Sequence, residues 1–423
     1  MDSLKSGVVR LLRWSEKYTK TDMVYLAKGG FWLVLAQVGS VLLSFALAVA
    51  FGHLAGQDTY GNYKYVISLA GLFTAFSLTG IGTAVTQATA RGYEGSLRQG
   101  ARLSLKWGWG VSVLALAVAG YYFFFEHDAF LAVALVIVAV CMPLMNAYSL
   151  FGSFLNGKKD FTRSSIYGVL NAALPTLILI AALFWTDRAI VFIITYFVAN
   201  TIADIIAHIT TLRHAKNEEQ DPDIFLYGTH LSVMGIVNTI ASKIDSVSVF
   251  ILLGPVQLAI YAYAAAIPEQ IKGGIKIIGA LAMPKFSQRT VSEIKATIWG
   301  RIFLLTAALA CAVLVYVGLA HWIFALFFPV YMDSIWYSQL YAASIVFTGF
   351  VTPLTAILQA QRKTRELYFA TSVGSVTLII LLPVLTFFWG ILGAVISQIL
   401  YRAVNAGTAI ILTLRLQDDQ LLS

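Results

Sequence analysis

Charge is scarce in this chain of 423 residues. Asp, Glu, Lys and Arg make up 12% of it, while hydrophobic residues make up 59% and the mean hydropathy is +0.78. A soluble domain would carry about twice that charged fraction. The composition therefore excludes an ordinary soluble protein and predicts a polytopic membrane protein.

Cysteines and nucleotide or zinc motifs are also scarce or missing. The two cysteines, Cys141 and Cys311, lie in apolar runs, so neither a disulfide framework nor a metal site is expected. The sequence has no Gly-x-x-x-x-Gly-Lys-Ser/Thr loop and no His-Glu-x-x-His motif. The loops expected outside the cell are too short to carry a catalytic domain. We therefore expect a protein that is not an enzyme and has no cofactor or metal.

The first 28 residues are basic but have no apolar core of the kind that a removable signal peptide contains. We interpret residues 1–28 as a basic amphipathic cytoplasmic segment that lies on an anionic membrane surface. The net charge of +8 does not indicate nucleic-acid binding, because the basic residues form short clusters between apolar segments.

Twelve segments are long and apolar enough to cross a bilayer, which takes about 20 helical residues. Each crossing should be helical, since hydrocarbon offers no hydrogen-bond partner to a bare backbone. The predicted fold class is all-α, with about 12 transmembrane helices. The expected spans are approximately 29–53, 64–88, 106–125, 129–155, 164–186, 188–212, 227–253, 256–284, 297–320, 336–360, 367–388 and 390–414.

The distribution of basic residues predicts the orientation. Of 29 Lys and Arg residues, 23 fall in segments on the side of the two termini, and only Lys64 and Arg188 fall in loops on the other side. Cytoplasmic loops of membrane proteins carry such an excess. Both termini of this cell-membrane protein are therefore predicted to be cytoplasmic.

The chain divides into two halves that resemble each other. A polar stretch from Arg213 to Asp223 follows the sixth span and reads as a solvated linker. The predicted units are an N-terminal segment 1–28, an N-lobe 29–212, a linker 213–226, a C-lobe 227–414 and a tail 415–423. At a constant offset of 198, the matching residues are Gly56 with Gly254, Tyr63 with Tyr261, and Tyr65 with Tyr263. Six spans per half predict a parallel repeat, with chance similarity among apolar helices as the alternative.

Several short motifs follow one another along the chain. They are Gly52–Gly56 leading to Tyr60–Tyr63, then Ser77–Ala90 followed by Arg91, then Lys243–Asp245 followed by Gly254 and Tyr261, and finally Pro284–Ser287. In order and spacing they resemble the polysaccharide flippases (Wzx-type, O-antigen), a family of the multidrug/oligosaccharidyl-lipid/polysaccharide (MOP) exporter superfamily. The resemblance implies a V-shaped bundle of two six-helix lobes that moves a lipid-diphosphate-linked glycan to the outer leaflet. Membrane lipids and the glycan polymerase or glycosyltransferases of the same pathway are the partners it implies.

Ionisable residues interrupt the seventh and eighth spans, between Tyr227 and Gln288. They are Lys243, Asp245, Glu269, Lys272 and Lys276. Charges at bilayer depth are costly, so they are retained where they face a polar cavity or each other. With Arg402 they predict a central cavity in which Lys243, Lys272, Lys276, Arg402 and Glu269 bind the substrate. The alternative is that Glu269 only neutralises Lys272 or Lys276 inside a helix interface.

Two acidic positions have further interpretations. Asp245, with Glu269, could exchange a coupling ion; Asp245 could instead form a structural ion pair, for which Arg402 is the candidate partner. Asp204 and His208, four residues apart in the sixth span, are expected to make a local polar contact rather than a proton relay.

The first two spans contain no Asp, Glu, Lys or Arg between Lys28 and Asp58 or between Lys64 and Arg91. Peptidoglycan-precursor flippases carry basic residues in these helices, and cation-exporting MATE pumps often carry an acidic one. The cavity charge is therefore expected on the C-lobe alone, with a surplus of +2 that suits an anionic glycan carrier. We expect a flippase that works by alternating access coupled to H⁺ or Na⁺. A MATE-like multidrug or small-molecule antiporter is the second hypothesis, and a scaffold without cargo is the third.

Overall fold

The computed structural model describes residues 23–286, 291–361 and 363–415, with the side chains of 35–272, 298–361, 363 and 365–415. The surface helix predicted within 1–28 and the tail 415–423 thus lie almost entirely outside the described residues. The described elements, in chain order, are α2 (Met23–Leu54), α3 (Gln57–Phe73), η1 (Thr74–Phe76), α4 (Ile81–Ala90), α5 (Ser96–Phe124), α6 (Ala129–Tyr148), α7 (Phe151–Gly157), α8 (Phe161–Leu183), α9 (Ala189–Leu212), α10 (Ile224–Ala241), α11 (Ile244–Leu253), α12 (Pro255–Phe286), α13 (Val291–Phe327), η2 (Pro329–Tyr331), α14 (Ser334–Ile345), α15 (Thr348–Ala360) and α16 (Thr364–Arg415).

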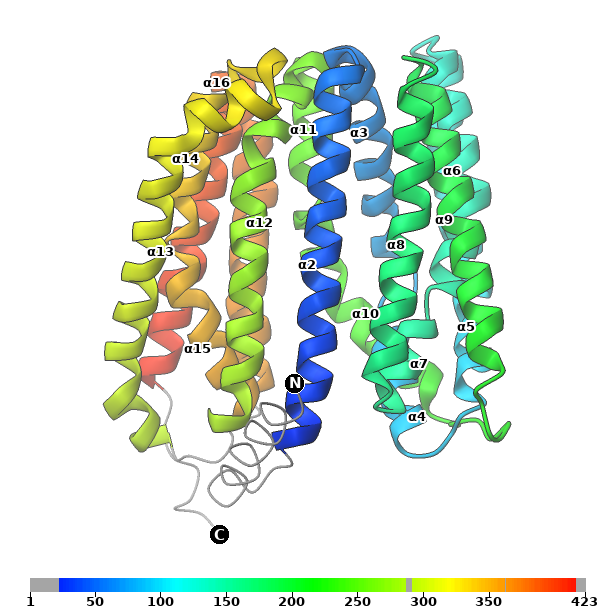
Figure 1. The fold of residues 1–423 in the computed structure, drawn as a ribbon, viewed down its shortest axis with the longest axis vertical. Coiled ribbons are helices and arrows are strands. Elements are labelled where there is room, and N and C mark those ends of the chain that lie inside the picture. Colours follow the sequence, from blue (N-terminus) through cyan, green and yellow to red (C-terminus); the bar gives the residue numbers. More distant parts are fainter. Residues whose placement is uncertain (1–22, 287–290, 362, 416–423) are drawn as a thin grey trace, which may run out of the picture.

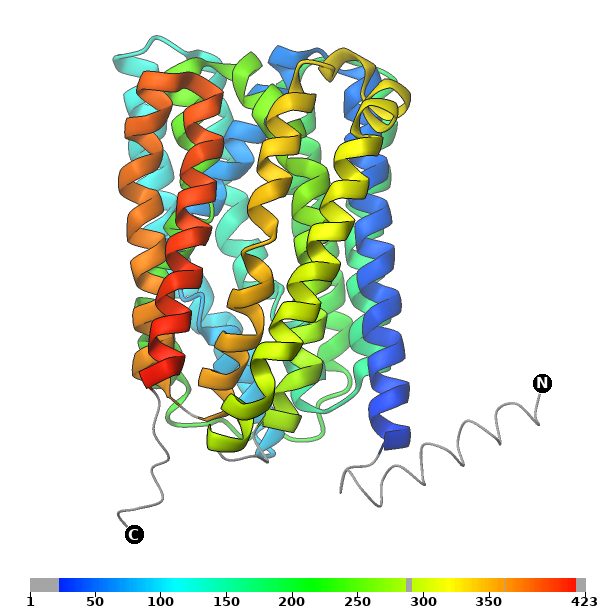
Figure 2. The ribbon, with the colours of Figure 1, turned by 90° about the vertical axis from the view of Figure 1, so that its left-hand side faces the viewer.

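These helices account for twelve crossings. Nine described helical segments are long and apolar enough to span a membrane, and α3–η1 with α4, bent by 60°, makes a tenth. The chain of α16 reverses at Gly390, whose φ is +59°, and its halves run antiparallel (Figure 2), so α16 crosses twice. The 32 residues of α12 extend about 48 Å and supply the last crossing. The all-α class with about 12 transmembrane helices is confirmed, although the second crossing begins at Gln57, seven residues before its predicted start.

The helices form two lobes (Figure 1). In the N-lobe, α5 packs on α6, α2 on α8, and α9 on both α6 and α8. In the C-lobe, α12 packs on α14 and α15, and α16 on α11 and α15. We call the end where α2 meets α3 and α11 meets α12 the upper end, as in Figure 1, and the opposite end the lower end.

The lobes close against each other at the upper end. Gly61 of α3 lies on the start of α12, so closely that a Cβ there would lie 2.0 Å from the carbonyl oxygen of Pro255. The ring centroids of Tyr60 and Tyr263 are 4.9 Å apart across the lobes, and the Tyr263 hydroxyl donates to the carbonyl oxygen of Ala48 at 2.8 Å. Backbone contact and aromatic packing leave little space here.

The repeat is visible in this closure. Gly56 and Gly254 each directly precede the first residue of a helix, α3 and α12. Tyr65 stacks on Phe250 of the opposite lobe with ring centroids 3.7 Å apart, and its counterpart Tyr263 reaches α2 of the opposite lobe. The predicted parallel repeat of two six-helix lobes is confirmed.

At the lower end, α10 connects the lobes. The Gly80 N–H donates to Ser232 Oγ at 2.9 Å, and Gln87 Nε2 donates to the Tyr227 hydroxyl at 2.9 Å. The first helix of the C-lobe therefore packs against α4 of the N-lobe.

The segment between α9 and α10 folds onto the N-lobe. The Gly95 N–H donates to the carbonyl oxygen of Glu219 at 2.8 Å, and Gln99 Nε2 donates to that of Asp221 at 3.1 Å. Asp221 is only 6% exposed, whereas Glu218, Glu219 and Asp223 of the same segment are exposed, as a solvated linker predicts. Donors in the α4–α5 turn and in the first turn of α5 bind the backbone of this segment, and the segment therefore packs against the N-lobe.

Candidate functional site

A cavity of about 1080 Å³ lies between the lobes, with walls from α2, α3, α9, α10–α14 and α16. Phe45, Phe327 and Phe328 bound it toward the closed upper end. Leu42 on α2, which is 62% exposed, forms part of its edge. Toward the lower end the lining continues with Asn238, Thr371, Ser375 and Asn405. We call this cavity the chamber.

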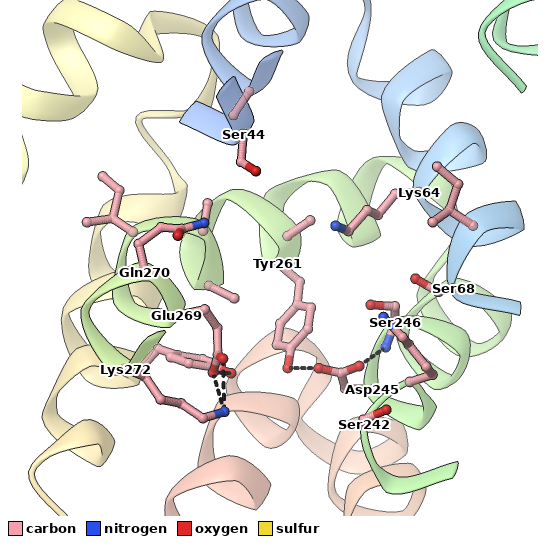
Figure 3. Close-up of a pocket in the computed structure, with 18 of the residues that line it drawn as sticks. Ser44, Lys64, Ser68, Ser242, Asp245, Ser246, Tyr261, Glu269, Gln270 and Lys272 are labelled. Carbon is pink, nitrogen blue, oxygen red and sulfur yellow. Dashed lines mark hydrogen bonds and ion pairs between the residues drawn. The ribbon is translucent and has the colours of Figure 1, made fainter. Parts of the chain in front are cut away.

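A helix break places Asp245 in the chamber wall. The crossing formed by α10 and α11 is interrupted before Ile244, so Asp245 lies in the first turn of α11, where backbone N–H groups have no helical partner. The Ser246 N–H donates to Asp245 Oδ1 at 2.6 Å. The Tyr261 hydroxyl donates to Oδ2 at 3.0 Å (Figure 3), and Gln398 Nε2 approaches the same oxygen at 3.4 Å. The close partners of Asp245 are therefore neutral donors.

Two lysines, one from each lobe, lie near this carboxylate. Lys64 of α3 and Lys243 at the helix break both line the chamber and both interact electrostatically with Asp245. Lys243 extends over Gly71, where a Cβ would lie 2.8 Å from its Cε, so it packs on the opposite lobe. Within the part of the chain described, no carboxylate lies within 4 Å of either amine.

Glu269 of α12 has a different environment. Its carboxylate accepts from Lys272 Nζ at 2.9 Å, from Arg402 Nη2 at 2.6 Å and from the Tyr341 hydroxyl at 2.8 Å. Arg402 is 3% exposed, stacks over the Tyr341 ring at 4.8 Å and donates through Nη1 to Ser344 Oγ at 2.6 Å. Glu269 is thus held by two cations and a phenol, as the neutralising alternative for Lys272 expects.

The structure brings most of the predicted site residues together. Lys243, Asp245, Glu269 and Lys272 line the chamber, whereas Arg402 lies behind Tyr341 and outside the lining. Arg402 pairs with Glu269 instead of Asp245, because Gln398, one turn earlier on α16, occupies the position beside Asp245. The side chain of Lys276 lies outside the described residues.

Lys64 was missed. The sequence placed it in an outer loop, and that assignment is wrong, because α3 begins at Gln57, seven residues before the predicted span. The segment from Gln57 to Lys64 is too polar to resemble a lipid-facing helix, yet it is helical, and its residues Tyr60, Tyr63 and Lys64 line the chamber. The expectation of an uncharged N-lobe wall is therefore also wrong. The signal that could have found Lys64 is its position between the repeated residues Tyr63 and Tyr65.

Among described side chains, the chamber network comprises four cations and two carboxylates. The cations are Lys64, Lys243, Lys272 and Arg402, against Asp245 and Glu269, which gives a surplus of +2. No group of three Asp, Glu, His or Cys residues suited to a metal ion occurs among the residues described. Chemically, the chamber offers amines, hydroxyls and amides to an anionic, hydroxyl-rich ligand.

Comparisons with known proteins agree with this architecture. A family model described as "Polysaccharide biosynthesis protein" matches residues 26–290. No curated protein sequence matches the chain.

Several solved structures share the fold. An inward-facing multidrug resistance MATE family transporter of the MOP superfamily has a TM-score of 0.69 at 14% identity. The alignment covers 90% of this chain and 96% of the transporter's chain. The lipid II flippase MurJ in an inward closed conformation has a TM-score of 0.63 at 14% identity, covering 89% and 86%. An outward-facing MATE transporter has a TM-score of 0.62 at 15% identity, covering 92% and 94%.

Proposed function

Because this chain belongs to the polysaccharide biosynthesis protein family and has the MOP exporter fold, we propose that it flips a lipid-diphosphate-linked oligosaccharide across the membrane. It is a multi-pass membrane transporter. The proposal concerns the cargo, its direction and the residues that hold it.

One observation carries the proposal: the chamber presents Lys64 and Lys243, from opposite lobes, with no carboxylate within 4 Å of either amine among the residues described. A pyrophosphate carries at least two negative charges and would accept hydrogen bonds from both amines. An anion bound between the lobes would also draw them together, which is how a ligand can bias a two-lobed transporter.

The size and lining of the chamber suit a glycan attached to the diphosphate. Pockets for drug-sized ligands measure about 300–1,000 Å³, and a chamber of about 1080 Å³ exceeds them. Its lining includes Ser68, Ser242, Ser246, Asn238 and Asn405, which can hydrogen-bond sugar hydroxyls.

We assign the lower end to the cytoplasm, by the excess of basic residues there. Arg91, Arg98, Lys158, Lys159, Arg163, Arg213 and Lys216 lie in or beside the loops at that end. Both termini would then be cytoplasmic. The closed upper end and the chamber that continues toward the lower end would correspond to an inward-facing state that receives cargo from the cytoplasmic leaflet.

The residues have different proposed roles. Lys64 and Lys243 hold the diphosphate, and Lys272 adds positive charge to the α12 wall. Lys276 is proposed for the same role from the sequence alone. Glu269 positions Lys272 and the Tyr341 hydroxyl, with Arg402 holding Glu269 from behind. Asp245 is the proposed coupling carboxylate, because its close partners are neutral.

The test is a flipping assay with the full chain reconstituted in vesicles, using a panel of fluorescent lipid-diphosphate sugars. Replacing both Lys64 and Lys243 by Gln should slow flipping at least a hundredfold, because each charged hydrogen bond contributes about 1.5–3 kcal/mol. The matched control is Lys272→Gln, which removes an amine already paired with Glu269 and should slow flipping less than tenfold.

Two results would contradict the proposal. Normal flipping by the Lys64→Gln/Lys243→Gln double variant would remove the assignment of the diphosphate site. Export of cationic drugs by the wild type, with no flipping of any lipid-diphosphate sugar, would identify a MATE-like antiporter instead.

A further inference from the structure

A second buried polar cluster lies inside the N-lobe, away from the chamber charges. Four polar residues follow one another on α9 at a spacing of four: Tyr196, Asn200, Asp204 and His208. Residues four apart in a helix lie on nearly the same face. Tyr196 lines the chamber, and Asn200 Nδ2 donates to its carbonyl oxygen at 2.7 Å. The row therefore leads from the chamber wall into the lobe.

Asp204 is the only acid in this row and is 5% exposed. Its carboxylate accepts a hydrogen bond from Asn171 Nδ2 of α8 at 2.9 Å. Among the described side chains, no Lys, Arg or His nitrogen lies within 4 Å of it. A buried carboxylate without a cation is costly, and taking up a proton removes that cost. Asp204 differs in this from Glu269, whose charge is neutralised by two cations.

Two polar atoms of this cluster have no hydrogen-bond partner within the described residues. His208, which is 4% exposed, has no hydrogen-bond partner at Nδ1, and Asn171 has none at Oδ1, within the part of the chain described. An Asn side chain can turn its oxygen or its NH₂ toward the same neighbour. Asn171 can therefore donate to an ionised Asp204 and, after a flip, accept from a protonated one. The site suits both protonation states.

Several other titratable groups lie in or around this cluster. They are Tyr196 and His208 on α9, Tyr148 on α6 with its ring centroid 5.0 Å from that of His208, Tyr167 on α8, which contacts His214, and Arg98 on α5, whose charge acts on His208. Arg98 itself pairs with Glu218. No group of three His, Cys, Asp or Glu residues suited to a metal ion occurs among the described residues.

We propose that Asp204 is a proton-binding site of the N-lobe, which takes up and releases a proton during the transport cycle. It is separate from Asp245 in the C-lobe, and the inference does not depend on which cargo the chamber carries. Asp204 lies about two helical turns along α9 from Tyr196, which lines the chamber wall, so lobe movements can change its surroundings.

Infrared difference spectroscopy tests the proposal on the full chain in lipid nanodiscs without any cargo. The carbonyl band of a protonated carboxyl group disappears when the group ionises, so spectra are recorded over a pH titration. The wild type should show a titrating component that is lost in Asp204→Asn and kept in Asp245→Asn. Asn171→Leu removes the donor to the carboxylate and should shift the midpoint of that component upward by about one pH unit.

A component that persists in Asp204→Asn would overturn the proposal, as would a midpoint unaffected by Asn171→Leu. A midpoint that shifts when K⁺ is replaced by Na⁺ would show a sodium site in its place. Flipping assays provide a second measurement: Asp204→Asn should lose its stimulation by a pH gradient and keep flipping without one. The spectra are interpretable even where no tested cargo is flipped, so failure of the cargo assignment is distinguishable from failure of this one.

Discussion

The two carboxylates of the chamber have opposite surroundings. Glu269 accepts from Lys272 at 2.9 Å, Arg402 at 2.6 Å and Tyr341 at 2.8 Å, so its charge is neutralised inside a network. Asp245 has neutral donors at hydrogen-bond distance, while Lys64 and Lys243 act on it from beyond 4 Å.

The difference shows where a ligand can act. An ion pair that is already closed gives a bound anion little to gain, since the anion must displace a carboxylate at close range. Amines that only approach a carboxylate are available to a ligand. The same residue types thus form closed ion pairs around Glu269, while around Asp245 they leave amines that a ligand can bind. The two sites therefore respond differently to substitution.

The largest expected effect is a loss of stability when the ion pair between Arg402 and Glu269 is broken. Arg402→Gln removes a guanidinium that is 3% exposed and leaves Glu269 and Tyr341 without their buried partner. Breaking such a pair costs about 3–5 kcal/mol of unfolding free energy. Lys272→Gln, at a side chain that is 30% exposed, should cost about 1 kcal/mol or less. Denaturant unfolding in detergent measures the unfolding free energy of both variants. Equal losses in the two would contradict the idea that buried Arg402 stabilises the fold more than partly exposed Lys272.

The next effect is on anion affinity. Asp245→Asn raises the described surplus from +2 to +3 while keeping the shape of the site, so binding of a short-chain isoprenyl diphosphate should tighten about tenfold, or 1.4 kcal/mol. Glu269→Gln is the matched change at the other carboxylate. It also raises the surplus by one, but it should lower stability and tighten binding less, because part of the uncovered charge belongs to Arg402, which is buried outside the lining. Calorimetric titration measures the affinities; unchanged binding in Asp245→Asn would show that this carboxylate does not compete with the ligand.

Flipping by the same variant tests the coupling role of Asp245. If Asp245 exchanges the coupling ion, Asp245→Asn should lose the dependence of flipping on an ion gradient. A variant that flips normally, and whose flipping is also insensitive to collapse of the gradient, would remove the coupling assignment.

The spans and the repeat followed from the sequence because hydropathy and backbone hydrogen bonding constrain a membrane chain strongly. Gly56 and Gly254 marked the start of equivalent helices, and the apolar runs fell on the crossings, although α3 begins seven residues before its predicted span. Asp245 and Lys272 were found since charge inside an apolar run has few explanations.

Two features could not be predicted from the sequence: the place of Lys64 in the chamber wall, and the residue with which Arg402 pairs. Hydropathy averages over all faces of a helix, so a span whose polar side borders a chamber looks like a loop, as the segment before Lys64 did. Spacing along one helix gives angles around that helix but does not say which neighbouring helix lies opposite. Gln398 and Arg402 are one turn apart on α16, and only the packing of α11, α12 and α16 decides which of them reaches Asp245.

The smallest expected effect is a loss of stability at a third carboxylate, Glu94. This residue lies outside the membrane-spanning segments, where water weakens an ion pair. Glu94 pairs with Lys158 at 2.8 Å, and Lys158 Nζ also donates to the carbonyl oxygen of His214, which holds the α9–α10 segment onto the N-lobe. Burial opposes ionisation, but the bonds from Lys158 and the Lys216 N–H lower the pKa of Glu94 below its ordinary value of 4.5. The ionised form is therefore favoured by folding.

A lowered pKa gives stability that is complete above the unfolded value and is lost as the pH falls through the folded one. Glu94→Gln should cost about 1 kcal/mol of unfolding free energy at pH 7, and the difference from wild type should shrink below about pH 4. Unfolding curves between neutral and acid pH measure this, with Arg98→Gln, at an exposed pair with Glu218, as the control that changes little. A deficit that stays constant into acid would mean that the amide disturbs packing, and that the charge of Glu94 does not hold the segment.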